Sequence, residues 1–345
     1  MKRFATLVLV IAIGVLSFAG CASAGSTTAA VTTAATTTIT TTASTAATTK
    51  GDEKVYRVGF VNLADSDANC FQAAQTFKAV VESDEFKTKI GSDKKIEVLA
   101  ADSNADIAKQ TSNVETLLTK GVDFMFIIGV DTKGNSTAVK ACNEAGVPVF
   151  MVATEATEGE YRFIGFNETT FGQSQGNFVV KNLKQNGTVC YLGGTPGREA
   201  TVAREAGSLD LIKKDRPDVQ IIANQTGDFS KETAMKVTED WIQAYKKFDC
   251  IIAADNKMAS GAIEALKAAN MIQDVMVVGC IVPGTWDADL VRDGLMAYGV
   301  FVSFKVLGET CADVAAKLYM GENIEHKTYM EMIDIDKTTY SQYFK

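Results

Sequence analysis

The polar residues of this chain that could bind a ligand or act in catalysis lie mainly in short segments that follow apolar, strand-like runs. These segments are rich in Asp, Asn and Thr and contain few of the residue types that act as nucleophiles or proton shuttles. With one histidine, His326, neither Ser/His/Asp catalysis nor a histidine-rich metal site has the residues it needs. We therefore expect reversible binding of a small polar ligand, with no catalytic residue, cofactor or metal. The segments are 62–69, 101–104, 129–132, 153–155, 194–204, 227–229, 255–257 and 281–287.

An alternation of strand-like and helix-like segments must position these polar residues. Phe71, Ala74, Phe77 and Val81 recur at helical spacing after the first β-rich run, and the pattern repeats along the chain. The expected strands are 55–61, 96–100, 123–128, 146–151, 188–193, 219–223, 249–254 and 275–280. The expected helices after residue 130 are 136–145, 171–185, 199–214, 230–247 and 258–269.

Apolar residues, above all Val, Ile, Phe and Cys, dominate these strands, which is typical of parallel sheets covered by helices on both faces. Two series of such units, the second starting near Phe163, predict an α/β fold with two doubly wound parallel-sheet lobes. Ligands of this architecture bind outside the carboxyl ends of the strands, where the polar segments lie.

The N-terminus has the layout of a removable signal peptide over residues 1–20. Lys2 and Arg3 precede an apolar run, residues 7–16, that is too short to span a bilayer. Residues 18–21, Phe-Ala-Gly-Cys, resemble the bacterial lipobox, with Phe where Leu is usual. We expect Cys21 to be lipidated and to anchor the chain at the extracytoplasmic face of the cell membrane. An ordinary signal peptide, cut after Ala22 or Ala24, is the alternative.

A low-complexity segment follows the cysteine. Of the 29 residues from Ala22 to Lys50, 25 are Ala, Thr or Ser. No apolar period there could bury a core, so we expect residues 21–53 to be a disordered, lipid-anchored linker.

The charge of the remaining chain limits the classes of partner that it could bind, and the spacing of its cysteines indicates their role. The whole chain has a formal charge of −8, which becomes −11 without Lys2, Arg3 and Lys50. This acidic balance argues against nucleic acid. Six cysteines follow Cys21 without CxxC or metal-ligand spacing, and we expect them to be buried apolar side chains rather than a disulfide framework.

The order and spacing of several motifs resemble the sugar-binding proteins of the ribose and galactose type, the solute receptors of ABC transporters. The similarity is collinear from about residue 54 to the C-terminus. The matching motifs are Val98-Leu-Ala-Ala-Asp-Ser-Asn-Ala-Asp-Ile-Ala-Lys-Gln-Thr111, Leu117-Leu-Thr-Lys-Gly-Val-Asp123, Ala145-Gly-Val-Pro-Val149, Ala254-Asp-Asn-Lys-Met-Ala-Ser-Gly-Ala-Ile-Glu-Ala-Leu266 and Asp274-Val-Met-Val-Val-Gly279.

This resemblance implies a type I periplasmic binding protein-like fold, with a hinge of three crossovers near residues 165–167, 301–303 and 330–332. The first lobe is then 54–165 plus 303–330, and the second is 166–302 plus 331–345. The lobes close on the ligand, which is a sugar or sugar-like molecule. The closed, monomeric receptor is recognised by the permease of an ABC transporter.

The resemblance also implies which residues contact the ligand. Asp67 or Asn69 supplies a polar contact and Phe71 stacks on the sugar from the first lobe. The second lobe contributes contacts through these matched positions: the aromatic Phe229, the adjacent Asp255 and Asn256, and Arg204, which grips a ring oxygen or hydroxyl. Glu155, Asn167, Trp286 and Phe301 complete the implied set.

Departures from the family pattern affect the expected ligand. Ala153 and Thr154 replace the Asp-Arg pair of ribose-type members, and Cys280 and Ile281 replace an aromatic residue and Asp. Without these charged contacts, a standard aldopyranose is disfavoured. A deoxy sugar, a nucleoside-like molecule or a small polyol fits better, in a pocket made more aromatic by Trp286, Tyr298 and Phe301.

Several of these residues also have purely structural interpretations. Phe71 could begin the buried face of its helix, and Asp255 could cap the following one. Arg204 could be a surface residue paired with Glu205 or Asp210, and Trp286 could serve in packing.

Two other functions fit parts of the sequence. Residues 193–197, Gly-Gly-Thr-Pro-Gly, lie between a strand and a helix as a nucleotide-phosphate loop would, but lack the full GxGxxG pattern. The same lobes could instead report a ligand to a membrane kinase or chemoreceptor. A transcriptional repressor of this fold is excluded by the export signal and by the absence of an N-terminal helix-turn-helix.

Overall fold

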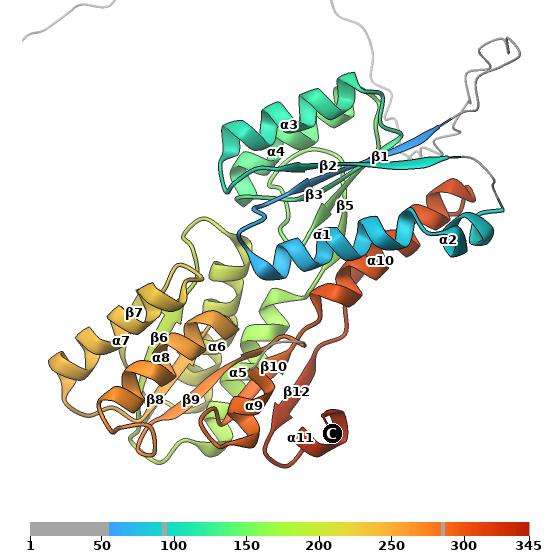
Figure 1. The fold of residues 1–345 in the computed structure, drawn as a ribbon. Coiled ribbons are helices and arrows are strands. Elements are labelled where there is room, and N and C mark those ends of the chain that lie inside the picture. The colour runs from blue at the N-terminus through green and yellow to red at the C-terminus, as the bar shows by residue number, and fades with distance from the viewer. Residues whose placement is uncertain (1–54, 92–94, 284–286, 345) are drawn as a thin grey trace, which may run out of the picture. The chain divides into compact units, whose positions relative to one another are not determined.

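The computed structural model describes residues 55–91, 95–283 and 287–344, which form two α/β lobes (Figure 1). The predicted signal peptide, the linker, Cys21 and Trp286 lie outside the described residues. Within that described part, no helix is both long enough and apolar enough to cross a membrane.

A parallel six-stranded sheet forms the centre of the first lobe, in the order β11-β5-β4-β3-β1-β2. Helices α1 and α10 cover one face of this sheet and α3 and α4 cover the other (Figure 1). The strands are β1 (Tyr56–Asn62), β2 (Ile96–Asp102), β3 (Phe124–Ile128), β4 (Val149–Val152), β5 (Arg162–Gly165) and β11 (Lys327–Tyr329). The helices are α1 (Ala68–Val81), α2 (Asp84–Lys89), α3 (Ile107–Thr119), α4 (Thr132–Glu144) and α10 (Phe304–Tyr319).

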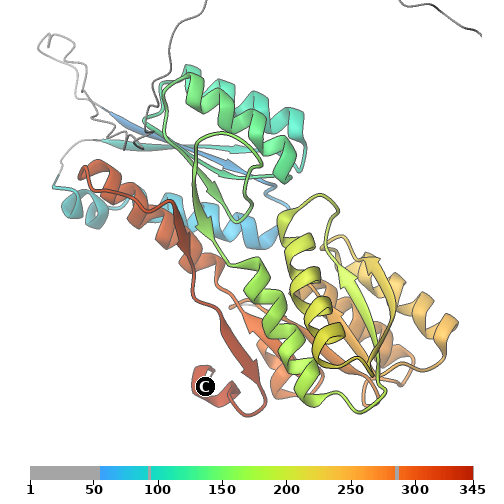
Figure 2. The same cartoon turned by 180° about the vertical axis from the view of Figure 1, so that it is seen from behind.

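The second lobe repeats this design in the order β12-β10-β9-β8-β6-β7, with α5 and α6 on one face and α7 and α8 on the other (Figures 1 and 2). Among the described strands of this lobe only the β10–β12 pair is antiparallel, so the edge strand departs from the expected parallel pattern. The strands are β6 (Thr188–Gly193), β7 (Gln220–Thr226), β8 (Cys250–Ala253), β9 (Met276–Ile281), β10 (Tyr298–Phe301) and β12 (Ile333–Asp336). The helices are α5 (Glu168–Asn182), α6 (Glu199–Asp215), α7 (Lys231–Tyr245), α8 (Asn256–Ala268), α9 (Asp287–Arg292) and α11 (Tyr340–Tyr343).

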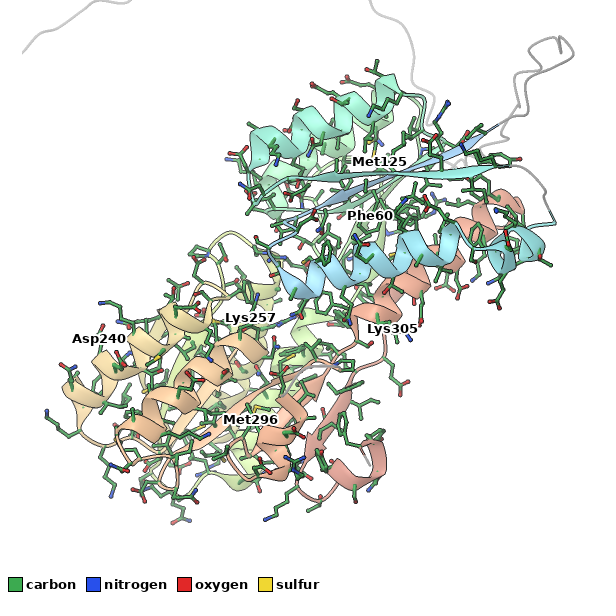
Figure 3. The ribbon with its side chains drawn as sticks, in the orientation of Figure 1. Phe60, Met125, Asp240, Lys257, Met296 and Lys305 are labelled. Carbon is green, nitrogen blue, oxygen red and sulfur yellow. The ribbon has the colours of Figure 1, made fainter. Side chains whose placement is uncertain are left out.

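Burial on both faces explains why the central strands are almost entirely apolar. On the first sheet, Phe60 packs with the core beside α1 and α10, whereas Met125 packs with the core beside α3 and α4 (Figure 3). Side chains alternate between the two faces of a strand, so each strand must supply apolar residues to both cores.

Three short segments connect the lobes. They are residues 166–167 between β5 and α5, residues 302–303 between β10 and α10, and residues 330–332 between β11 and β12. The predicted fold of two α/β lobes joined by a three-segment hinge is therefore confirmed.

Two details of the helices differ from the sequence expectation. Helix α4 begins at Thr132 rather than at residue 136, because Asp131 accepts a hydrogen bond from the Gly134 amide and starts the helix earlier. In α1 the buried stripe begins at Cys70 and not at Phe71, which is 39% exposed.

All six cysteines of the described residues are buried, as expected for small apolar side chains. Burial raises the pKa of the Cys142 and Cys190 thiols to about 12. These thiols are therefore protonated and unreactive at neutral pH.

Candidate functional site

A pocket with an empty volume of about 590 Å³ lies where residues of both lobes and of the connecting segments meet. Its lining combines charged, amide, aromatic and small apolar side chains. The lining residues are Asp67, Asn69, Cys70, Ala153, Phe166, Glu168, Arg198, Ala200, Arg204, Phe229, Asp255, Asn256, Lys257, Cys280, Val282, Val302 and Phe304.

The starts of helices α1 and α8 form the polar end of this pocket. Asp67 caps α1 by accepting hydrogen bonds from the Asn69 and Cys70 amides, and Asp255 caps α8 by accepting from the Met258 amide. Both caps follow a strand of a parallel sheet, so the fold brings two carboxylates to one place. Helix capping by Asp255 is thus confirmed.

Lys257 lies between these two carboxylates. Its Nζ is 2.8 Å from Asp67 Oδ2 in the first lobe and 4.0 Å from Asp255 Oδ2 in the second (Figure 3). Burial opposes ionisation of Asp67, but attraction to Lys257 outweighs it and holds the pKa of Asp67 below its ordinary value. For Asp255 burial dominates and raises the pKa. The Lys257 ammonium therefore lies near two carboxyl groups, of which Asp67 has a lowered pKa and Asp255 a raised one.

A buried ion pair forms the floor of the pocket. Arg204 Nε donates to Glu168 Oε2 at 2.5 Å, and the side chains are 9% and 3% exposed. The guanidinium also donates to the Ala254 carbonyl at 2.6 Å and lies 3.8 Å from the centroid of the Phe171 ring. The surface pairing of Arg204 with Glu205 or Asp210 considered above is wrong, because α5 packs closely on α6 and buries this face of the helix.

Arg198 and Phe229 form a further wall of the pocket. The Arg198 guanidinium donates to the Thr154 hydroxyl of the first lobe at 3.1 Å and lies 5.3 Å from the centroid of the Phe229 ring. A side chain at Gly194 would lie 2.1 Å from this ring, so a glycine is required there. Phe229 itself adopts φ = 50°, a strained conformation for a bulky residue and one that is concentrated at ligand sites.

Small and apolar residues line the rest of the pocket. Among them is Cys280, and burial raises the pKa of its thiol. The aromatic rings come from Phe166, Phe229 and Phe304. The expected contribution of Tyr298 is wrong, because its ring stacks on Phe178 and its hydroxyl donates to Asp334 at 2.5 Å.

Six of the sequence-predicted site residues line this pocket: Asp67, Asn69, Arg204, Phe229, Asp255 and Asn256. Asn69 Nδ2 and Asn256 Oδ1 are 3.5 Å apart, which joins the lobes directly. The ligand contacts of these residues remain predictions.

The structure places the other predicted residues elsewhere. Phe71 is half-exposed on α1, and Phe301 packs edge-to-face on Phe344, with ring centroids 5.6 Å apart. Neither lines the pocket. Phe71 is turned away because capping at Asp67 puts Cys70, one residue earlier, on the buried face of α1.

Glu155 and Asn167 line a second cavity instead, beside the lobe connections. Glu155 pairs with Lys327 at 2.6 Å, and Asn167 caps α5. Glu199 faces the same cavity, where burial and the nearby carboxylates of Glu155 and Glu168 raise its pKa to about 7.

Sequence reasoning missed Arg198 and Lys257. Both lie in segments that were singled out after strands, but neither was identified individually. Their long side chains reach across to the other lobe, and no local pattern encodes that contact. Across residues 55–91, 95–283 and 287–344, no group of three or more His, Cys, Asp or Glu residues is arranged to hold a metal.

Comparison with known proteins identifies the family to which this chain is similar. Residues 58–323 match the family described as the periplasmic binding protein domain. The ribose import binding protein of Bacillus subtilis is 27% identical over 232 residues, which cover 67% of this chain and 74% of that protein. The putative rhizopine-binding protein of Rhizobium meliloti is 29% identical over 264 residues, which cover 74% and 84%.

The fructose-binding periplasmic domain of a hybrid two-component system has the same fold, with a TM-score of 0.75 at 21% identity. The alignment covers 83% of this chain and 92% of that domain. The family match covers most of both lobes and all the segments that build the pocket. This chain belongs to the periplasmic binding protein family.

Proposed function

We propose that this chain is an extracytoplasmic binding protein that captures a sugar or sugar-like molecule between its two lobes and delivers it to the permease of an ABC transporter. In this role it binds its ligand without chemical change and acts as a monomer. The single observation that carries the proposal is the pocket itself. There, carboxylate, amide and guanidinium groups from both lobes meet the Phe229 ring.

The chemistry of the lining supports a polyhydroxylated ligand. Asp67, Asp255 and Asn256 offer hydrogen-bond acceptors, and the guanidinium groups offer donors, which together match hydroxyl groups that both donate and accept. An aromatic ring such as Phe229 packs against the apolar face of a sugar ring. The names of the relatives are consistent with this class, since they bind ribose and a rhizopine.

Binding is tested by thermal shift of the purified full-length chain with neutral sugars, polyols and nucleosides. A ligand that binds only the folded state should raise the melting temperature as its concentration increases. Phe229→Ala should then weaken binding about tenfold or more, whereas Val202→Ala, at an exposed site on α6, should not. No stabilising ligand in the panel, together with a catalytic turnover, would contradict the proposal.

Lipid anchoring at Cys21 belongs to the same proposal. The apolar run of residues 7–16, the following small residues and the Ala/Thr-rich linker support it. Cells expressing the chain should incorporate labelled palmitate and retain the protein in the membrane fraction, and Cys21→Ser should abolish both. Release of the wild-type chain into the soluble fraction would refute the anchor.

The two-component relative shows that this fold also serves ligand sensing. Delivery to a permease is therefore tested by uptake. Deleting the gene should abolish import of the radiolabelled ligand found by thermal shift. Unchanged import combined with a lost transcriptional response would instead assign the chain to sensing.

A further inference from the structure

The charges of the pocket are not evenly paired. Two of its three cations already have carboxylate partners, Arg204 with Glu168 at 2.5 Å and Lys257 with Asp67 at 2.8 Å. The third carboxylate, Asp255, is bound by the Met258 amide and lies 4.0 Å from Lys257. The third cation, Arg198, differs from the other two because it has no carboxylate partner among the described residues.

Among the described residues, no carboxylate lies within 4.0 Å of the Arg198 guanidinium. Its hydrogen-bond partner in this part of the chain is the neutral Thr154 hydroxyl, and its Nε is buried there without an acceptor. A buried donor on a charged group that lacks an acceptor is costly, so a ligand acceptor there would be strongly favoured.

The neighbours of Arg198 favour an anion at this point. Arg198 is the N-cap residue of α6, a helix of 17 residues, and it offers no side-chain acceptor to the first turn. The positive end of that helix therefore begins at Arg198 itself, and Ala200 of its first turn also lines the pocket. Ala153 and Ala200 also line the pocket, and their small side chains leave space for a ligand group.

We propose, on the basis of the function proposed above, that the ligand is a sugar acid, a small polyhydroxylated molecule that carries one carboxylate. Arg198 receives this carboxylate through Nε and a terminal nitrogen, the paired geometry that guanidinium groups offer to carboxylates. The hydroxyl groups lie toward Asp255, Asn256 and Asn69. A single unpaired cation matches a monoanion, so a carboxylate fits better than a doubly charged phosphate.

The test is calorimetric titration of the full-length chain with matched pairs. These are D-galacturonate with D-galactose, D-glucuronate with D-glucose, and D-ribonate with D-ribose, and D-ribose 5-phosphate serves as the phosphate probe. In at least one pair the acid should bind on the order of tenfold tighter than its neutral partner. Arg198→Gln should remove that preference by weakening the acid and not the neutral sugar. Arg198→Lys should retain part of it.

Arg57→Gln is the matched control, because Arg57 lies on β1 at the end of the sheet opposite the pocket and pairs with Glu97. It should leave every affinity unchanged. Neutral sugars that bind as tightly as the acids, or tighter binding of ribose 5-phosphate than of ribonate, would overturn the sugar-acid assignment and leave sugar binding intact. Absence of heat from every compound would overturn the proposed function as well.

Discussion

The buried pair of Glu168 and Arg204 provides a quantitative test of how the pocket floor is built. Its two charged atoms are 2.5 Å apart, and both side chains are almost fully removed from solvent. At an effective dielectric constant of about 20, unit charges at this distance attract by roughly 7 kcal/mol. Part of this energy offsets the cost of desolvating both groups. Glu168→Gln would leave the guanidinium charged and buried, so we expect the free energy of unfolding to fall by about 3–5 kcal/mol.

Urea unfolding followed by tryptophan fluorescence measures this effect, since Trp241 is buried in the core of the second lobe and reports its unfolding. Asp210→Asn is the control, because Asp210 pairs with Lys213 on the exposed face of the same helix. That substitution should cost less than about 1 kcal/mol. The double variant Glu168→Leu with Arg204→Met should recover most of the loss, since it leaves no unpaired charge. A cost below about 1 kcal/mol for Glu168→Gln, or a double variant as unstable as the single one, would refute the electrostatic reasoning.

Three further predictions concern packing, ionisation and thiol chemistry. Gly261→Ala should destabilise the chain by about 1–3 kcal/mol in thermal unfolding, because the new Cβ would lie 2.2 Å from the Lys231 carbonyl oxygen between α7 and α8. Gly193→Ala, with no neighbour closer than 3.6 Å, should have little effect, and equal effects would contradict the packing argument. Since the pKa of Glu199 is raised from 4.5 to about 7, this group destabilises the folded chain increasingly as the pH rises from about 4.5 to 7, fully above that range and scarcely below it. Glu199→Gln should therefore raise stability by roughly 1–3 kcal/mol at pH 8 and scarcely change it at pH 4.5; a gain that is independent of pH would count against this assignment. The six buried thiols should react with a chromogenic disulfide reagent only when the chain is unfolded, and rapid labelling of the native protein would show that they are accessible.

The fold was predictable because its signals are local and repeated. Strands such as Cys250–Ala253 contain only apolar residues, and each is followed by a polar cap and a helical period, so the alternation can be read directly. The hinge positions came from the resemblance, and the short segments at 166–167, 302–303 and 330–332 agree with them.

The site was predictable where a functional residue also has a local structural role. Asp67 and Asp255 were identifiable because each begins a helix after a strand. The buried stripe of α1 begins at Cys70, one residue before the position read from the sequence, and Phe71 is 39% exposed and does not line the pocket. Arg198 and Lys257 were not recognised because their importance depends on the facing lobe, through Thr154 and Asp67, which are distant in the sequence.

The central claim is that the pocket between the two lobes holds a polyhydroxylated ligand. The most direct test is a crystal structure of the chain with the tightest-binding sugar from the thermal-shift screen. The ligand is predicted to lie against the Phe229 ring, with its hydroxyl groups hydrogen-bonded to Asp255 and Asn256 from the second lobe and to Asn69 from the first. Density for that sugar at any other place, with the pocket filled only by water, would contradict the account.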